Sequence, residues 1–166
     1  TRIEKLRSGQ FDGLLLAASG LLRLGINQDL HVDYLSTEWF TPACGQGVIA
    51  VQIRTQDRVL DANLSRVSHD ETFQAVQLER QIVRCFGGDC STPLGVFVSK
   101  GPGSFCVRVF LGDTLGKKSI YHTENWPVQL DSYQNLIDCL VESILLQGGD
   151  VILDQCHKDS SGGFDE

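Results

Sequence analysis

A cysteine on a turn bounded by glycine and proline is the residue of this chain best suited to covalent chemistry. Residues 86–95 read Phe-Gly-Gly-Asp-Cys-Ser-Thr-Pro-Leu-Gly, so Cys90 lies between Gly87-Gly88 and Pro93. Glycine lets the backbone adopt positive φ and approach a bound group closely, and proline fixes φ at the end of the turn. Because the thiolate is a strong nucleophile, this pattern predicts a reactive sulfur at a loop tip.

Regular elements are expected on both sides of this turn. Apolar residues at helical spacing predict a helix that ends at Phe86, and the apolar run 94–99 predicts a strand. Ser68 and Glu71 have the spacing of a capping box at the start of that helix. His69 lies beside them, and we interpret it as a surface residue of the first turn in preference to a general base.

The rest of the C-terminal half predicts a small antiparallel sheet covered by helices. Further strands are expected at 104–111 and 117–124, separated from the first strand and from each other by glycine-containing turns. Alternation places four apolar residues of the second strand on its core face: Phe105, Val107, Val109 and Leu111. A helix over 130–147 follows, and the polar chain from Asp154 onward is expected to be disordered.

The N-terminal half alternates apolar runs with short helices. The run 11–18 has the composition of a strand buried on both faces, and a further strand is expected at 48–53. Helices are expected at the following positions: 1–8 with Gly9 as the stop, 21–24 closed by Gly25, and 57–66.

Composition narrows the functional classes. The 166 residues are 42% hydrophobic and 21% charged, as in soluble globular proteins, and the net charge of −7 disfavours nucleic acid and anionic membranes as partners. No apolar run approaches the roughly 20 residues that span a bilayer, and no N-terminal signal is visible, which predicts a cytoplasmic protein. The six cysteines form no C-x-x-C pair and no zinc-finger spacing with histidine, so we expect reduced thiols and no metal.

The run 90–95 resembles the cofactor-attachment turn of the porphobilinogen deaminase (hydroxymethylbilane synthase) family. Three other stretches, at 11–25, 42–51 and 69–72, are similar to family segments and follow in the family's order at roughly its spacing. One short motif would be weak support, whereas four in register cover nearly the whole chain.

This resemblance implies a transferase of tetrapyrrole and haem biosynthesis. In the family, the cysteine (Cys90 here) holds a dipyrromethane cofactor by a thioether, and four porphobilinogen units are condensed onto that primer with loss of ammonia. Arg2 and Arg23 match family positions that contact pyrrole carboxylates, which suits the bidentate guanidinium. The resemblance also places Gln46, in a glycine loop, and Gly88 beside the cofactor.

The resemblance further implies a division into parts and a longer protein. Residues 1–40 would complete a second, periplasmic-binding-protein-like α/β domain, 41–66 would form the hinge, return strand and helix of a first domain, and 67–156 would be the cofactor-carrying α+β domain, followed by a disordered tail at 157–166. The first-domain core, which holds the family's catalytic aspartate, would precede Thr1. We therefore name no catalytic residue and expect this chain to need that missing part for turnover, the complete enzyme being a monomer.

One residue of the turn departs from the family pattern, and two alternative functions remain open from the sequence. The chain departs from the commonest family pattern, since Asp89 stands where a second glycine usually precedes the cysteine, and a carboxylate beside a thiol opposes thiolate formation. A non-catalytic module could instead bind a carboxylated small molecule or a partner through Arg2, Arg23 and Gln46. A hydrolase built on Cys90 and His69 is less favoured, because nothing in the sequence orients the pair.

Overall fold

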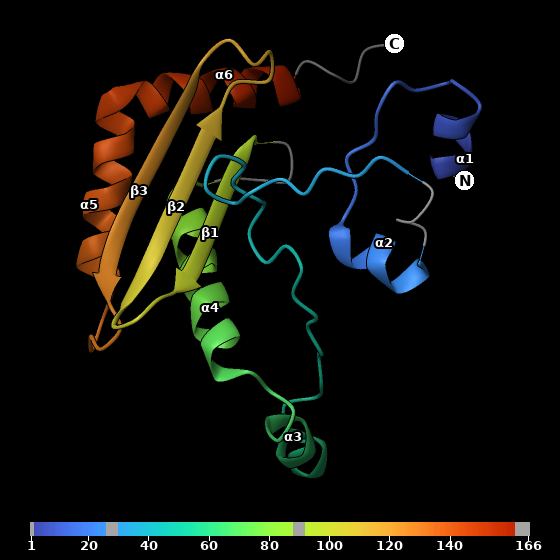
Figure 1. Cartoon of the computed structure of the whole chain (residues 1–166). Coiled ribbons are helices and arrows are strands. Elements are labelled where there is room, and N and C mark those ends of the chain that lie inside the picture. The colour runs from blue at the N-terminus through green and yellow to red at the C-terminus, as the bar shows by residue number, and fades with distance from the viewer. Residues whose placement is uncertain (1, 26–29, 88–91, 162–166) are drawn as a thin grey trace. The chain divides into compact units, whose positions relative to one another are not determined.

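The computed structural model describes residues 2–25, 30–87 and 92–161 (Figure 1). The chain divides into two compact units, Thr1–Ser36 and Thr37–Glu166, and each is described by itself. The architecture is mixed, with helices and one three-stranded antiparallel sheet. Within the described ranges, no helix is both long enough and apolar enough to cross a membrane.

The sheet of the second unit confirms the three predicted strands. They pair in the order β1 (Leu94–Lys100), β2 (Ser104–Gly112) and β3 (Ser119–Pro127). The predicted core face of β2 is confirmed, because Phe105, Val107, Val109 and Leu111 are at most 1% exposed. The third strand begins later than predicted, since the Asp113 carboxylate accepts the backbone N–H groups of Lys117 and Lys118 and holds them in the turn.

Two helices cover one face of this sheet (Figure 1). Helix α4 (Asp70–Cys85) packs on β1, and α5 (Gln134–Ile144) packs on α4 and β3. Trp126 of β3 is 2% exposed, stacks on Tyr133 with ring centroids 6.2 Å apart, and donates its indole N–H to Glu124. The hydrophobic core therefore lies between the sheet and these helices.

The capping box predicted at the start of α4 is wrong. His69, not Ser68, is the N-cap residue: its Nδ1 accepts the backbone N–H of Thr72 at 3.3 Å. The Glu71 carboxylate forms an ion pair with Lys100 at 3.0 Å instead of reaching back to the helix start. The end of the helix is as predicted, with Phe86 as C-cap and Gly87 at φ 61°.

The polar C-terminal stretch is helical where the sequence predicted disorder. After α5, a π-helical turn (η2, Leu145–Gly149) contains Gly148 at φ 97°, and α6 (Asp150–Ser161) follows. The prediction of disorder is wrong for 154–161, because Ile152, Leu153 and Cys156 recur at helical spacing and are buried in the core. Residues 162–166 lie outside the described ranges.

Two predicted strands do not form. Residues 11–17 and 48–53 contain no strand, and Leu15 and Ile49 are 67% and 82% exposed. A β-strand needs a neighbouring strand for its N–H and C=O groups, and none of the described residues provides one there.

The short helices of the N-terminal half are confirmed. α1 (Arg2–Arg7) precedes Gly9 at φ 74°, and α2 (Ala18–Leu24) ends at Gly25 at φ 63°. α3 (Arg58–Ser65) begins after Asp57, whose carboxylate accepts the Leu60 N–H at 3.0 Å. None of these three helices buries a residue.

Candidate functional site

The glycine loop at 41–47, which carries Gln46, lies directly against the sheet of the second unit. Gly45 and Gly47 have φ of 71° and 81°, a conformation that favours glycine and bends the loop tightly. A Cβ placed on Gly95 of β1 would lie 2.6 Å from the carbonyl oxygen of Thr41. Only glycine at position 95 therefore allows the loop to approach the strand this closely.

A buried carboxylate joins this loop to the sheet. Glu79, in the middle of α4, is 4% exposed. Its Oε1 accepts the N–H of Val98 in β1 at 2.9 Å, and its Oε2 accepts the N–H of Gly45 at 2.8 Å. The thiol of Cys44 also hydrogen-bonds to this carboxylate. One side chain thus satisfies donors from two segments that are far apart in sequence.

Burial dominates the electrostatics of this cluster. Burial raises the pKa of Glu79, against the opposing effect of the hydrogen bonds from Val98, Gly45 and Cys44. Burial likewise raises the pKa of Cys44, the negative Glu79 raises it further, and Arg80 opposes both. The Cys44 thiol is therefore a weak nucleophile in this setting.

Glu79 was not among the site residues predicted from the sequence. A usable signal was present, because Ala75, Leu78 and Ile82 define the buried stripe of α4 and Glu79 falls within it. An acidic residue on the apolar face of a helix is rarely buried without hydrogen-bond partners.

A cavity of about 310 Å³ adjoins the loop and the buried carboxylate. Its walls come from the loop, the first half of α4 and the outer end of β1, and the ion pair of Lys100 with Glu71 lies on its rim. The lining residues that carry polar side chains are Gln46, His69, Glu71, Thr72, Glu79, Ser99 and Lys100. Gln46 therefore lies beside an open polar cavity, as a ligand-contacting residue requires.

The other predicted site residues lie in the first unit or outside the described residues. Arg2 on α1 and Arg23 on α2 belong to the first unit, and both are exposed. Gly88 and Cys90, the predicted attachment turn, lie outside the described residues. Their roles stay predictions.

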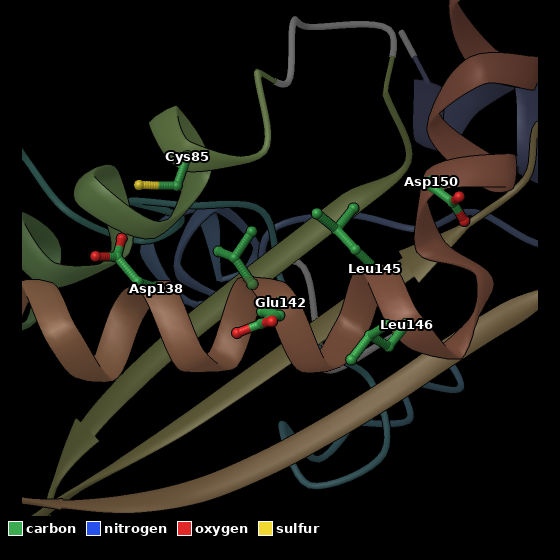
Figure 2. Close-up of a pocket in the computed structure, with 7 residues that line it drawn as sticks. Cys85, Asp138, Glu142, Leu145, Leu146 and Asp150 are labelled. Atoms are coloured by element: carbon green, nitrogen blue, oxygen red, sulfur yellow. The ribbon is translucent and has the colours of Figure 1, made fainter.

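A second hollow, of about 620 Å³, lies on the helical side of the second unit (Figure 2). Both apolar side chains and carboxylates line it, and none of the predicted site residues does. The lining residues are Cys85, Asp138, Val141, Glu142, Leu145, Leu146 and Asp150. Across the described ranges, no group of three or more His, Cys, Asp or Glu side chains is arranged to hold a metal ion.

The cysteines described by the structure differ in accessibility. Cys156 is buried and therefore poorly accessible, and Cys44 is half-buried with a raised pKa that disfavours the thiolate. Cys85 and Cys139 are exposed. These two exposed thiols are useful controls for any test of covalent attachment.

Comparison with known proteins identifies the group to which the chain is related. A family model described as "Porphobilinogen deaminase, dipyromethane cofactor binding domain" matches residues 1–62. The porphobilinogen deaminase of Thiobacillus denitrificans is 33% identical over 154 residues, which is 93% of this chain and 49% of the relative. That of Coxiella burnetii is 36% identical over 92% of this chain and 49% of the relative. That of Exiguobacterium sibiricum is 37% identical over 78% of this chain and 43% of the relative.

The chain is thus a mixed α and β protein whose N-terminal part matches a cofactor-binding domain. It belongs to the porphobilinogen deaminase family, as the sequence motifs predicted. The chain spans about half the length of the curated relatives it matches.

Proposed function

We propose that this chain contributes the primer-holding part of a hydroxymethylbilane synthase. The complete activity condenses four porphobilinogen units onto a cysteine-tethered dipyrromethane, with loss of ammonia at each addition. The observation that carries this proposal is the similarity to porphobilinogen deaminases over 93% of the chain. The match of residues 1–62 to a dipyrromethane-binding family domain supports the same cofactor.

The residues present suit a ligand rich in carboxylates. The exposed guanidinium groups of Arg2 and Arg23 are permanently charged and can each make two parallel hydrogen bonds to an acetate or propionate side chain. Gln46 offers an amide donor at the edge of a cavity. In a chain of net charge −7, such local donors, and not the overall field, must hold an anionic ligand.

Cys90 is the proposed attachment residue. Its sulfur would form a thioether to the primer, which supplies a nucleophilic pyrrole end at high effective concentration when bound. Gly88 would allow the backbone to approach the tethered group. Of the described cysteines, Cys44 and Cys156 are poorly suited to this role, whereas the exposed Cys85 and Cys139 serve as controls for it.

We further propose the division of the chain that the resemblance implied. Residues 1–40 would complete a periplasmic-binding-protein-like domain, 41–66 would be the hinge, return strand and helix of another domain, and 67–156 would carry the cofactor. The exposed apolar side chains of 11–17 and 48–53 support this division, because such runs are stable as strands only beside further strands. The partner would be a polypeptide equivalent to the N-terminal half of a relative, and the substrate would be porphobilinogen.

Intact-mass measurement tests this function. The chain is incubated with porphobilinogen, alone and with a polypeptide covering the N-terminal half of the Thiobacillus denitrificans relative. We expect a mass increase of two pyrrole units that Cys90→Ser abolishes and Cys139→Ser retains. We expect steady-state release of bilane only from the mixture. An adduct that survives in Cys90→Ser, or no adduct in either sample, would overturn the proposal in favour of a non-catalytic module.

A further inference from the structure

The side chain of Glu79 is bound in a way that core packing alone does not require. It is one of two polar residues, with Thr92, that are buried in the described part of the chain. A buried carboxylate is costly unless hydrogen bonds compensate it, whereas an apolar side chain at this position of α4 would pack without that cost. We infer that position 79 requires a side chain with two hydrogen-bond acceptors.

The first acceptor requirement comes from the edge of the sheet. β1 pairs with β2 on one side only, so the backbone N–H groups on its other side lack a strand partner. The N–H of Val98 donates to Glu79 Oε1 at 2.9 Å, which satisfies one of them. The carboxylate thus caps the free edge of β1.

The second requirement comes from the glycine loop. The N–H of Gly45 donates to Glu79 Oε2 at 2.8 Å, and the neighbouring Cys44 thiol bonds to the same carboxylate. The chain before the loop is held independently, because the Tyr121 hydroxyl of β3 donates to the carbonyl of Glu38. The loop is therefore fixed at both its start and its tip.

We propose that Glu79 is a positioning residue: its carboxylate holds the loop that carries Gln46 at a fixed distance from β1. The link therefore fixes the position of Gln46, and of the cavity beside it, relative to β1 (Leu94–Lys100), the strand that follows Cys90 in the sequence. The inference rests on the proposed function for its consequence, but the link itself is a property of the described residues. Glu79 acts through the loop and needs no contact with the cofactor.

The substitution Glu79→Gln tests the link with little change in shape. Glutamine keeps one carbonyl acceptor and replaces the other oxygen with an NH2 donor, which faces an N–H group instead of accepting from it. We expect amide hydrogen exchange at Gly45 or Val98 to accelerate at least about tenfold, with exchange in β2 and β3 unchanged. Glu71→Gln, on the exposed side of the same helix, is the matched control and should leave both amides protected.

A second variant releases the loop without touching the carboxylate. Gly95→Ala places a Cβ within 2.6 Å of the Thr41 carbonyl and should push the loop away from β1. Both Glu79→Gln and Gly95→Ala should raise the rate of Cys44 alkylation, because each uncovers the thiol. Since Gly95→Ala keeps the Glu79 carboxyl group, a faster reaction in both variants reports exposure of the thiol and not only the loss of this neighbouring group.

The functional consequence is measured separately. In the mixture with the N-terminal half of a relative, Glu79→Gln should slow primer attachment about tenfold at saturating porphobilinogen while the half-saturating concentration stays the same. Unchanged exchange and alkylation in Glu79→Gln would overturn the link itself. Accelerated exchange across the whole sheet would show a merely structural role, and a released loop with normal attachment would overturn the positioning role. Failure of attachment in the unsubstituted chain would count against the proposed function alone, because the exchange measurement does not depend on porphobilinogen.

Discussion

Two regions of this chain have similar apolar sequences and opposite structures. Val107 and Val109 of β2 are fully buried, whereas Ile49 and Val51 in the run 48–53 are 82% and 63% exposed. β2 has a hydrogen-bonded strand on each side and two helices on one face, and residues 48–53 have no strand beside them among the described residues. Apolar composition therefore creates the tendency to form a strand, and only a partner strand realises it.

The same comparison explains how the loop at 41–47 is held. This loop directly precedes the exposed run 48–53 in the sequence. None of its side chains is fully buried, and its position is held by the hydrogen bond from Gly45 to Glu79 of α4. The packed helix and sheet thus form the scaffold, and hydrogen bonds to Glu79 hold the loop against it.

The largest effect is expected in the packed region. Trp126→Ala should lower the free energy of unfolding by about 3–5 kcal/mol, because it removes a fully buried ring, its stacking on Tyr133 and its hydrogen bond to Glu124. Urea unfolding monitored by far-UV circular dichroism measures the loss. A loss below about 1 kcal/mol would mean that the core is less well packed than its burial indicates.

Glu79→Gln should cause the next largest loss of unfolding free energy, and the size of this loss should depend on pH. Loss of one acceptor should cost about 1–3 kcal/mol of unfolding free energy at neutral pH. Burial raises the pKa of Glu79 in the folded state, so the folded protein binds the proton more readily than the unfolded chain. The contribution of Glu79 to stability is therefore greatest below its unfolded pKa and falls as the pH rises through its folded pKa.

Urea unfolding at a series of pH values checks this sign. The parent chain should lose stability with rising pH relative to Glu79→Gln, and the exposed Glu71→Gln should follow the parent. Parallel curves for the parent and Glu79→Gln would show that Glu79 titrates alike in the folded and unfolded states.

Asp113 should contribute less to the free energy of unfolding than Glu79, and its contribution should depend on pH in the opposite direction. Burial opposes its ionisation, but the backbone N–H groups of Lys117, Lys118, Leu115 and Gly116 outweigh that effect and lower its pKa. Its contribution is therefore present above the unfolded pKa and is lost as the pH falls through the folded pKa. Asp113→Asn should flatten the acid side of the stability profile, and an unchanged acid limb would contradict the role of this turn.

The smallest effect is expected in the exposed apolar run. Ile49→Asp should change the unfolding free energy of this chain by less than about 0.5 kcal/mol, because the side chain is already in water. In the mixture with the N-terminal half of a relative, the same substitution should weaken association, measured by analytical ultracentrifugation. A large loss of stability in the chain alone would show that 48–53 packs as a strand after all.

Local sequence patterns were sufficient for much of the fold. Glycines at 9, 25 and 87 ended helices as predicted, and alternation in β2 identified its buried face. These features depend on backbone sterics and on neighbours within a few residues. The predictions failed where the partner was distant: Glu71 pairs with Lys100 instead of capping α4, and α6 is stabilised by burial of Cys156.

In the candidate site, too, some features follow from the local sequence and others depend on distant partners. The motifs identified the family and drew attention to Gln46, because both rest on residue types at fixed spacing. The sequence could not reveal that Glu79 binds Gly45 and Val98, which lie 34 and 19 residues away.

The sequence by itself determined the family, the helix ends and the alternation of the sheet, since each is encoded in residues close together in the chain. Only the tertiary structure decided which apolar runs became strands and which carboxylate was buried. The physical reason is that a strand or a buried charge is stable only when hydrogen-bonding groups from distant segments meet it.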